Sequence, residues 1–172
     1  MGGLRVAILG AANIGRYHAR EYNALEEKVV AILGSTPESS KLAADSLKDF
    51  DIDARHYSSL DDMLSKESLN AVSICTSPNT HYAFVKAALE RGLHILCEKP
   101  LHWDLRDTPE ENLRKAEELL ELATKQDLIL AVNTQLAALF DAYLDGYRNN
   151  RQFSFENVDP ISFRVHILMS GK

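Results

Sequence analysis

The sequence feature that most constrains the fold is a short segment near the N-terminus, where an apolar run meets a glycine and then continues into a helical pattern. Val6–Leu9 predicts a buried strand, and Ile14, His18 and Tyr22 then recur at helical spacing. The turn between the two patterns reads Gly10-Ala11-Ala12-Asn13-Ile14-Gly15. The chain is therefore expected to pass from a strand through a tight turn directly into a helix.

This turn has the spacing of a dinucleotide-binding fingerprint, with alanine in place of the second glycine. Gly10 permits the sharp turn, Ala12 lets a pyrophosphate approach the backbone, and Gly15 allows the helix to pack closely on the strand. The helix N-terminus offers free N–H groups and the positive end of its dipole to a phosphate. A turn that uses glycine for geometry alone is the alternative, but the position directly after a first strand favours a nucleotide site.

The length of the chain is sufficient for one globular domain and a short additional segment. The 172 residues are 45% hydrophobic, and the formal net charge is −6 without a basic run, so nucleic acid is not expected as a partner. Cys75 and Cys97 end separate apolar runs without metal spacing, which predicts buried reduced thiols and a cytoplasmic location. We expect neither a secretory signal nor a membrane-spanning segment.

After the first helix, apolar strands continue to alternate with helices through short connections. The remaining strands are expected over 28–33, 55–57, 71–75, 94–97 and 128–132, and the helices over 37–50, 59–64, 79–91, 108–125 and 136–147. Such alternation predicts an α/β chain with a Rossmann-type, doubly wound parallel sheet.

The domain organisation changes near residue 150. We expect a nucleotide-binding domain over residues 1–150, followed over 151–172 by a connector and the first strand of a second α/β domain. Residues 161–167 alternate strictly between apolar and polar side chains, as a strand with one buried face does. One strand cannot form a sheet, so it either pairs with another molecule or begins a domain that this polypeptide lacks. A homo-oligomer is expected.

The loop after the second expected strand bears on the choice of cofactor. It reads Gly34-Ser35-Thr36 and lacks the acid that NAD-selective sites place there to accept bonds from the ribose hydroxyls. Ser35 and Thr36 can donate to a 2′-phosphate, and either also suits the N-cap of the next helix. Lys41 lies about one turn into that helix, and its long side chain is a candidate to reach back to the 2′-phosphate. The cofactor is therefore expected to be NAD or NADP, with NADP slightly favoured.

Two further loops follow strands whose carboxyl ends border the expected crevice. After the fourth strand, Pro78 ends the strand, Asn79 is expected as the helix N-cap, and His81 serves either as a base or as a structural residue; the loop reads Thr76-Ser77-Pro78-Asn79-Thr80-His81. After the fifth strand comes Glu98-Lys99-Pro100. A lysine there can donate a proton or hydrogen bond to a substrate oxygen, and a following proline favours an extended backbone. A solvated ion pair is the alternative for this tripeptide alone.

In order and spacing, the Gly10 turn, the Thr-Ser-Pro-Asn-Thr-His loop and Glu-Lys-Pro-Leu resemble the N-terminal domain of the glucose–fructose oxidoreductase, inositol dehydrogenase and rhizopine-catabolism (Gfo/Idh/MocA) family over residues 4–147. The resemblance implies an NAD(P)-binding domain of an oxidoreductase. Its Lys99 would assist catalysis at the hydroxyl or carbonyl of a sugar, cyclitol or related alcohol. The expected cofactor contacts are Gly10, Ala12, Asn13, Ile14, Gly15, Thr76, Ser77, Pro78, Asn79 and His81, to which we add Ser35, Thr36 and Glu98.

The sequence also departs from this pattern. Family members carry a second α/β domain with a catalytic aspartate and histidine, whereas this chain contains only the expected start of that domain, and His166 lies too early to be that histidine. The link over 102–107 is longer than usual, and Leu136 and Ala137 stand where many members carry arginines. We therefore expect the nucleotide-binding part of an enzyme, inactive alone. The alternatives are a non-catalytic dinucleotide-binding module and a methyltransferase. Glu98-Lys99-Pro100 argues against the methyltransferase.

Overall fold

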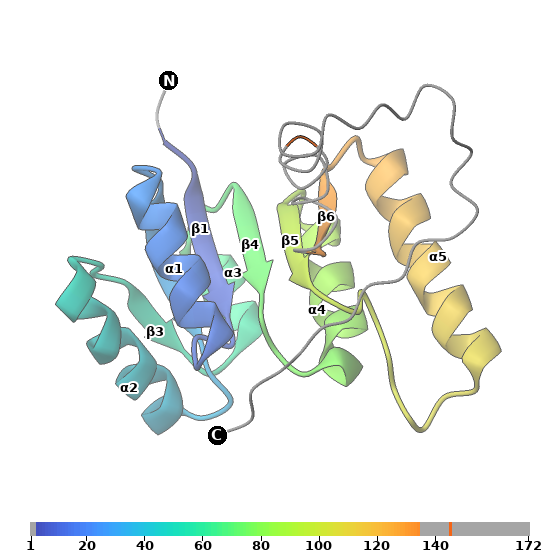
Figure 1. Ribbon diagram of the computed structural model, residues 1–172, viewed down its shortest axis with the longest axis horizontal. Helices are drawn as coiled ribbons and strands as arrows, with labels where there is room; N and C mark the ends of the chain where they lie inside the picture. The colour runs from blue at the N-terminus through green and yellow to red at the C-terminus, as the bar shows by residue number, and fades with distance from the viewer. Residues whose placement is uncertain (1–2, 135–144, 146–172) are drawn as a thin grey trace. The chain divides into compact units, whose positions relative to one another are not determined.

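The computed structural model describes residues 3–134 and 145. Residues up to Asn133 belong to one compact unit. Its described strands form one sheet in the spatial order β3-β2-β1-β4-β5-β6, and every neighbouring pair is parallel (Figure 1). The strands are β1 (Arg5–Leu9), β2 (Lys28–Leu33), β3 (Arg55–Tyr57), β4 (Ala71–Ile74), β5 (His94–Glu98) and β6 (Leu130–Asn133).

Helices connect the strands, so that the sheet is doubly wound as predicted. They are α1 (Ile14–Ala24), α2 (Pro37–Leu47), α3 (Leu60–Lys66), α4 (Pro78–Glu90) and α5 (Pro109–Lys125), with a short 3₁₀ turn η1 (Lys48–Phe50) after α2. The Rossmann-type expectation is thus confirmed. The helix expected over 136–147 lies outside the described residues except for position 145, and the strand expected over 161–167 lies entirely outside them.

The core has two layers because successive strand residues face opposite sides of the sheet. On one face, Val6 and Ile8 of β1 pack with Ala19 of α1 and Leu47 of α2. On the other face, Leu9 of β1 belongs to a cluster with residues of α3, α4 and α5, including Met63, Val85, Leu89 and Leu119. Burial on both faces explains why these strands read as continuous apolar runs.

Side-chain caps fix where three of the helices begin. The Thr36 and Thr108 side chains accept hydrogen bonds from the backbone N–H groups of Ser39 and Glu111, and Ser59 caps α3 in the same way. A proline follows Thr36 and Thr108 at the first helical position, where its missing N–H costs nothing. The expected N-cap at Asn79 is wrong. Helix α4 begins two residues earlier, with Ser77 as N-cap and Pro78 in the first turn.

At the amino-terminal edge of the sheet lies a buried carboxylate, Glu67, which immediately follows α3. It accepts hydrogen bonds from the Tyr57 hydroxyl at 2.7 Å and from the Arg55 guanidinium at 2.5 Å. Burial and the hydrogen bond to Glu67 raise the pKa of Tyr57 to about 12. The site described next lies at the opposite edge of the sheet, so Glu67 provides a matched control for experiments on it.

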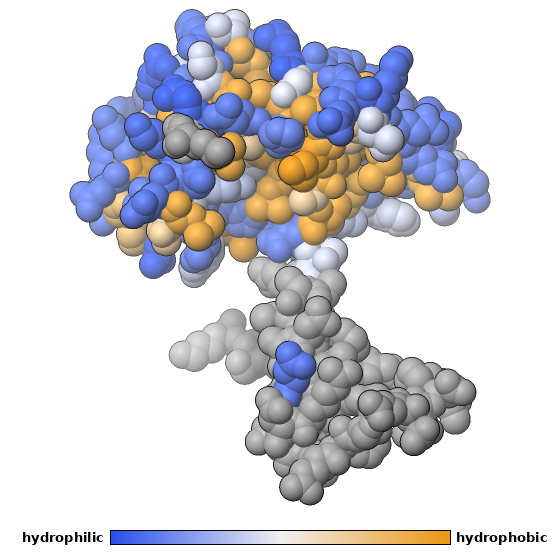
Figure 2. Space-filling model, turned by 90° about the horizontal axis from the view of Figure 1, so that it is seen from above, coloured by the Kyte–Doolittle hydropathy of each residue, from blue (hydrophilic) through white to orange (hydrophobic). Residues whose placement is uncertain are grey.

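The surface of the described unit is mixed in polarity. Figure 2 shows hydrophilic side chains around the rim of one face, with hydrophobic surface towards its middle. Among residues 3–134, no helix combines the length and the apolar character needed to cross a membrane.

Candidate functional site

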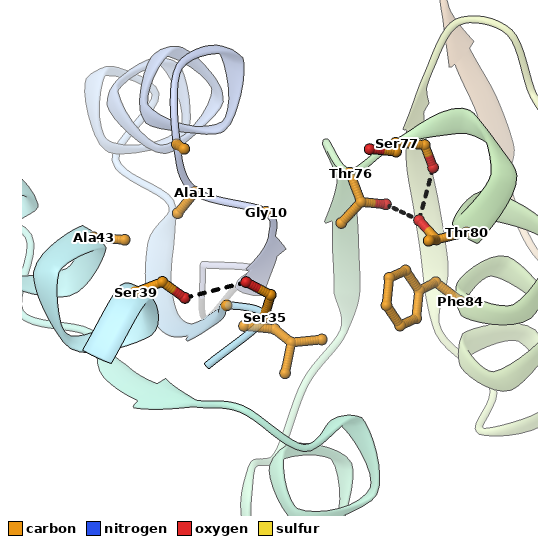
Figure 3. Close-up of a pocket in the computed structure, with 12 residues that line it drawn as sticks. Gly10, Ala11, Ser35, Ser39, Ala43, Thr76, Ser77, Thr80 and Phe84 are labelled. Carbon is orange, nitrogen blue, oxygen red and sulfur yellow. Dashed lines mark hydrogen bonds between the residues drawn. The ribbon is translucent and has the colours of Figure 1, made fainter. Parts of the chain in front are cut away.

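The described part of the chain has a crevice where the winding of the sheet reverses. From β1 the chain proceeds to β2 and β3 on one side, and then crosses to β4, β5 and β6 on the other. Open α/β sheets bind ligands outside the carboxyl ends of their strands at such a switch point. A cavity of about 350 Å³ lies there, lined by Gly10, Ala11, Ala12, Leu33, Gly34, Ser35, Ser39, Ala43, Thr76, Ser77, Thr80 and Phe84. Figure 3 shows Ser35 and Ser39 on one side, with Thr76, Thr80 and Phe84 on the other.

Two glycines, Gly10 and Gly15, allow the turn between β1 and α1 to lie close to the backbone around it. Gly10 has a φ of +83°, and a Cβ there would lie 2.9 Å from the carbonyl oxygen of Cys75. A Cβ at Gly15 would overlap the carbonyl oxygen of Gly10. The geometric roles expected for Gly10 and Gly15 therefore match the structure: the first permits the turn, and the second lets α1 begin close to it.

The helices that begin at the switch point differ from the others in their caps. Asn13 and Ser77 are the N-caps of α1 and α4, and neither side chain caps its helix, whereas α2, α3 and α5 all have side-chain caps. The first turn of α1 contains no acidic residue, and Ala12 and Asn13 are exposed beside it. At these N-termini the N–H groups of Gly15, Arg16 and Thr80 bond to the carbonyl oxygens of Ala12, Asn13 and Ser77, and Pro78 has no N–H. Among the described residues the N–H groups of Ile14 and Asn79 bond to no other backbone group, so one N–H at each N-terminus can receive an anion.

The side of the cavity next to β2 is lined by small polar and apolar groups. Ser35 Oγ lies 3.4 Å from Ser39 Oγ, and the Thr36 hydroxyl is used as the cap of α2. The Lys41 ammonium is held by Asp45 at 2.6 Å, and Lys41 does not line the cavity, contrary to the suggestion that it reaches back. The residues that line the cavity include neither an acid nor a base. No acidic residue from another element therefore takes the place of the acid that the Gly34-Ser35-Thr36 loop lacks.

The loop after β4 forms the other side of the cavity. Thr76 and Thr80 hydroxyls lie 2.7 Å apart, and Thr80 also donates to the carbonyl oxygen of Ser77. Exposed Asn79 and half-buried Pro78 do not line this cavity. The structure therefore brings Thr76 and Ser77 to the cavity, but neither Pro78 nor Asn79.

His81 lies beneath this loop and not in the crevice. Its side chain is completely buried, with Nδ1 2.9 Å from the Pro100 carbonyl oxygen and Nε2 3.0 Å from that of Thr76. The structure therefore does not place His81 in the crevice, because the ring has no exposed surface and both nitrogens face backbone groups. The residue instead ties the loop after β4 to the loop after β5.

The Glu98-Lys99-Pro100 segment directs its two charged side chains differently. Lys99 is exposed, and within residues 3–134 its ammonium has no hydrogen-bond or ion-pair partner. Oε1 of Glu98 accepts from Asn133 Nδ2 at 2.6 Å and contacts His18 Nε2 at 3.0 Å. The peptide bond between Lys99 and Pro100 is cis. Glu98 and Lys99 do not form an ion pair with each other. The Glu98 carboxylate is hydrogen-bonded within the protein, and the Lys99 ammonium is available to a ligand.

Comparison with known proteins agrees with this geometry. Residues 4–134 match GFO_IDH_MocA, the oxidoreductase family with an NAD-binding Rossmann fold. The chain belongs to this family.

Three members illustrate the relationship to the GFO_IDH_MocA family. UDP-N-acetylglucosamine 3-dehydrogenase of Acidithiobacillus ferrooxidans is 30% identical over 129 residues, which cover 75% of this chain and 36% of that protein. A solved structure of it matches with a TM-score of 0.68 at 27% identity, over 86% of this chain and 44% of that one. Myo-inositol 2-dehydrogenase of Thermotoga maritima is 25% identical, over 74% of this chain and 35% of that protein.

A third member shares the fold at lower identity. The WlbA dehydrogenase of Chromobacterium violaceum, solved in complex with NADH and UDP-GlcNAcA, matches with a TM-score of 0.68 at 24% identity, over 87% of this chain and 40% of that one. The chain spans less than half the length of each of these GFO_IDH_MocA relatives.

Two site residues of this family member were missed by the sequence reasoning. His18 was recognised only as one of the helically spaced residues of α1, and Asn133, directly after the strand expected over 128–132, was not singled out. Both contact Glu98, but their sequence separations from it are 80 and 35 residues, so no local pattern links them. The remaining signal was a polar residue on the apolar face of a helix that begins at the fingerprint turn.

The cysteines are free thiols in the structure, as the sequence predicted. Cys97 is buried and Cys75 is half-buried, and burial raises the pKa of each thiol to about 12. A thiol with so high a pKa stays protonated at neutral pH and is a poor nucleophile. Neither cysteine is therefore assigned a chemical role in this family member.

Proposed function

We propose that the crevice binds a nicotinamide dinucleotide and that this chain is the nucleotide-binding part of an oxidoreductase acting on a sugar, cyclitol or related alcohol. The observation that supports this most is the pair of uncapped helix N-termini, at Asn13 and Ser77, around a cavity of about 350 Å³ at the switch point. A negatively charged pyrophosphate is the group that such N–H groups and dipole ends favour.

The two halves of the dinucleotide are assigned to opposite sides of the Gly10 turn. The adenosine half would occupy the cavity beside Ser35 and Ser39, because the loop after the second strand of such sheets contacts the adenosine ribose. The pyrophosphate would lie at Ala12 and the start of α1. The nicotinamide half would then extend across the switch point towards Glu98 at the end of β5.

Lys99 is the residue proposed for acid–base chemistry. A bound nicotinamide supplies hydride exchange at its C4 atom. When a carbonyl is reduced, the developing negative charge on its oxygen needs a proton or a hydrogen bond, and the Lys99 ammonium can donate either. Lys99 suits this role because it is exposed directly after β5, at the carboxyl ends of the strands, and no carboxylate within residues 3–134 neutralises it.

The substrate class is proposed from the relatives together with this chemistry. One relative is named for dehydrogenation of UDP-N-acetylglucosamine and another for that of myo-inositol, and both compounds are polyhydroxylated. Substrate contacts beyond Lys99 would come from residues outside 3–134. The division near residue 150, self-association and a cytoplasmic location stay predictions.

For the cofactor, we propose that NADP is accepted at least as well as NAD. No carboxylate lines the cavity beside Ser35, so a 2′-phosphate would meet no direct repulsion there. The Ser35 and Ser39 hydroxyls can donate to it, but no cation lines the cavity to hold it strongly. The preference for NADP is therefore expected to be small.

A substitution at the fingerprint turn tests the proposed site. Ala12→Leu would place a bulky side chain where the pyrophosphate must approach the backbone, whereas Ala24→Leu makes the same change at the exposed far end of α1. Titration calorimetry should show NAD(H) and NADP(H) binding to the native chain and to Ala24→Leu. Binding to Ala12→Leu should be at least about a hundredfold weaker, equivalent to roughly 2.7 kcal/mol. Equal affinities in all three proteins would disprove the proposed site.

A further inference from the structure

A buried polar network that includes the last residues of β5 and β6 joins four elements of the fold. His18 of α1 contacts Ser73 of β4 through Nδ1 at 2.7 Å and Glu98 of β5 through Nε2 at 3.0 Å. Asn133 of β6 donates to the same Glu98 oxygen at 2.6 Å. The His18 and Glu98 side chains are only 8% and 13% exposed. Polar groups this deeply buried are costly unless satisfied, so the network strongly restricts where each side chain can lie.

The protons of the network follow from the chemistry of its members. A carboxylate can only accept hydrogen bonds, so His18 Nε2 carries a proton and donates it to Glu98. Asn133 Nδ2 and His18 Nε2 lie 3.4 Å apart because both donors point at the same oxygen, Oε1. In the neutral ring, Nδ1 then accepts from the Ser73 hydroxyl.

The second carboxylate oxygen of Glu98 is left available. Among the described residues, Oε2 accepts no hydrogen bond, whereas Oε1 accepts two. Neighbouring Cys75 and Tyr22 do not compete as charged groups, since burial raises the pKa of both. With Oε1 fixed on one side, Oε2 is the part of the carboxylate that a ligand hydroxyl can reach.

We propose that His18 is a positioning residue for Glu98, and through it for the reacting end of the cofactor site. By holding Oε1, His18 directs Oε2 to accept a hydrogen bond from a hydroxyl of the nicotinamide ribose. His18 lies in the first turns of α1, which begins at the pyrophosphate turn, so the network links the two halves of the proposed site through one rigid helix. This inference rests on the proposed function, because it needs a nicotinamide dinucleotide in the crevice.

Two substitutions of His18 distinguish the contribution of Nε2 from that of Nδ1. The amide nitrogen of a glutamine can take the place of Nε2 and still donate to Glu98, whereas an asparagine is one methylene shorter and reaches only the position of Nδ1. His18→Asn should therefore weaken NADH binding about tenfold, as expected for loss of a hydrogen bond to a charged group. His18→Gln should stay within about twofold of the native affinity.

A comparison of ADP with NADH distinguishes a positioning role of His18 from a general loss of folding. ADP contains the adenosine and pyrophosphate but lacks the nicotinamide ribose, so its affinity should be the same in the native chain and both variants. A merely structural role would weaken ADP and NADH together in His18→Asn. Glu67→Gln, a change to a buried carboxylate at the other edge of the sheet, should weaken neither ligand. Equal loss of ADP and NADH, or equal NADH affinities of the two His18 variants, would overturn the inference.

Nitrogen-15 NMR of the native chain tests the inference without any variant. The His18 ring should show a proton on Nε2, and its resonance should move on addition of NADH but not of ADP. A ring with its only proton on Nδ1 would contradict the assigned hydrogen bond. If the native chain binds neither NADH nor ADP, the proposed function fails and the inference fails with it. If it binds both but His18 shows no difference between them, only the inference fails.

Discussion

Replacing His81 by leucine should destabilise the fold strongly, because the completely buried ring connects two loops. His81 is completely buried, and its nitrogens lie 2.9 and 3.0 Å from the carbonyl oxygens of Pro100 and Thr76. A ring with one N–H donates to one of these carbonyls, and such a hydrogen bond contributes about 0.5–1.5 kcal/mol net. Leaving a buried carbonyl unsatisfied costs roughly 1–3 kcal/mol more.

These terms together predict that His81→Leu lowers the free energy of unfolding by about 2–4 kcal/mol. For a unit of this size, that corresponds to a melting temperature lower by roughly 8–16 °C. Urea denaturation followed by circular dichroism measures the loss. His56→Leu is the control, since His56 is exposed on β3 and its replacement should change stability by no more than about 0.5 kcal/mol. A loss below about 1 kcal/mol for His81→Leu would refute the assigned hydrogen bond.

Two further predictions concern the cofactor pocket and the cysteines. Ser35→Asp places a carboxylate beside the adenosine ribose and should favour NAD, so the dissociation constant of NADP divided by that of NAD should rise by about tenfold or more. An unchanged ratio would contradict the proposed pocket. A native chain that already binds NAD more than about tenfold tighter than NADP would also contradict it. Because burial raises the pKa of Cys75 and Cys97 to about 12, from 9.0, the folded chain holds these protons more tightly than the unfolded chain. The free energy of unfolding should therefore be unaffected by these thiols below about pH 9 and should fall as the pH rises above it. Alkylation of the thiols by iodoacetamide at pH 8 should be slow until urea is added. Rapid alkylation of the folded chain would contradict their burial.

The fold was largely predictable because the signals for it are local. Apolar runs, the Gly10 turn and the capping threonines each act within a few residues of chain, and all of them agree with the structure. The exception at Asn79 is instructive. Both Ser77 and Asn79 are good N-cap residues, but Pro78 already has the backbone conformation of a first helical residue, so the helix begins there.

The site was predictable only in part, because some of its contacts have no local signal. His18 contacts Ser73 and Glu98 at separations of 55 and 80 residues. Sequence periodicity places His18 on the buried face of a helix but does not indicate which strands it meets. His81 differs again, since its partners are backbone carbonyls, and a carbonyl is present at every residue. The sequence left His81 as either a base or a structural residue, and the structure shows the ring completely buried.

The most direct test of the proposed function is to map NADH onto the chain by the amide chemical shifts of the isotope-labelled protein. If the dinucleotide lies across the switch point, the amides of Gly10, Ser35, Thr76 and Lys99 should shift on titration, while that of Glu67 at the opposite edge of the sheet should not. ADP should reproduce the shifts at Gly10 and Ser35 and leave Lys99 unchanged. Shifts confined to the edge that carries Glu67, or no shifts at saturating NADH, would contradict the proposal that this crevice is the cofactor site.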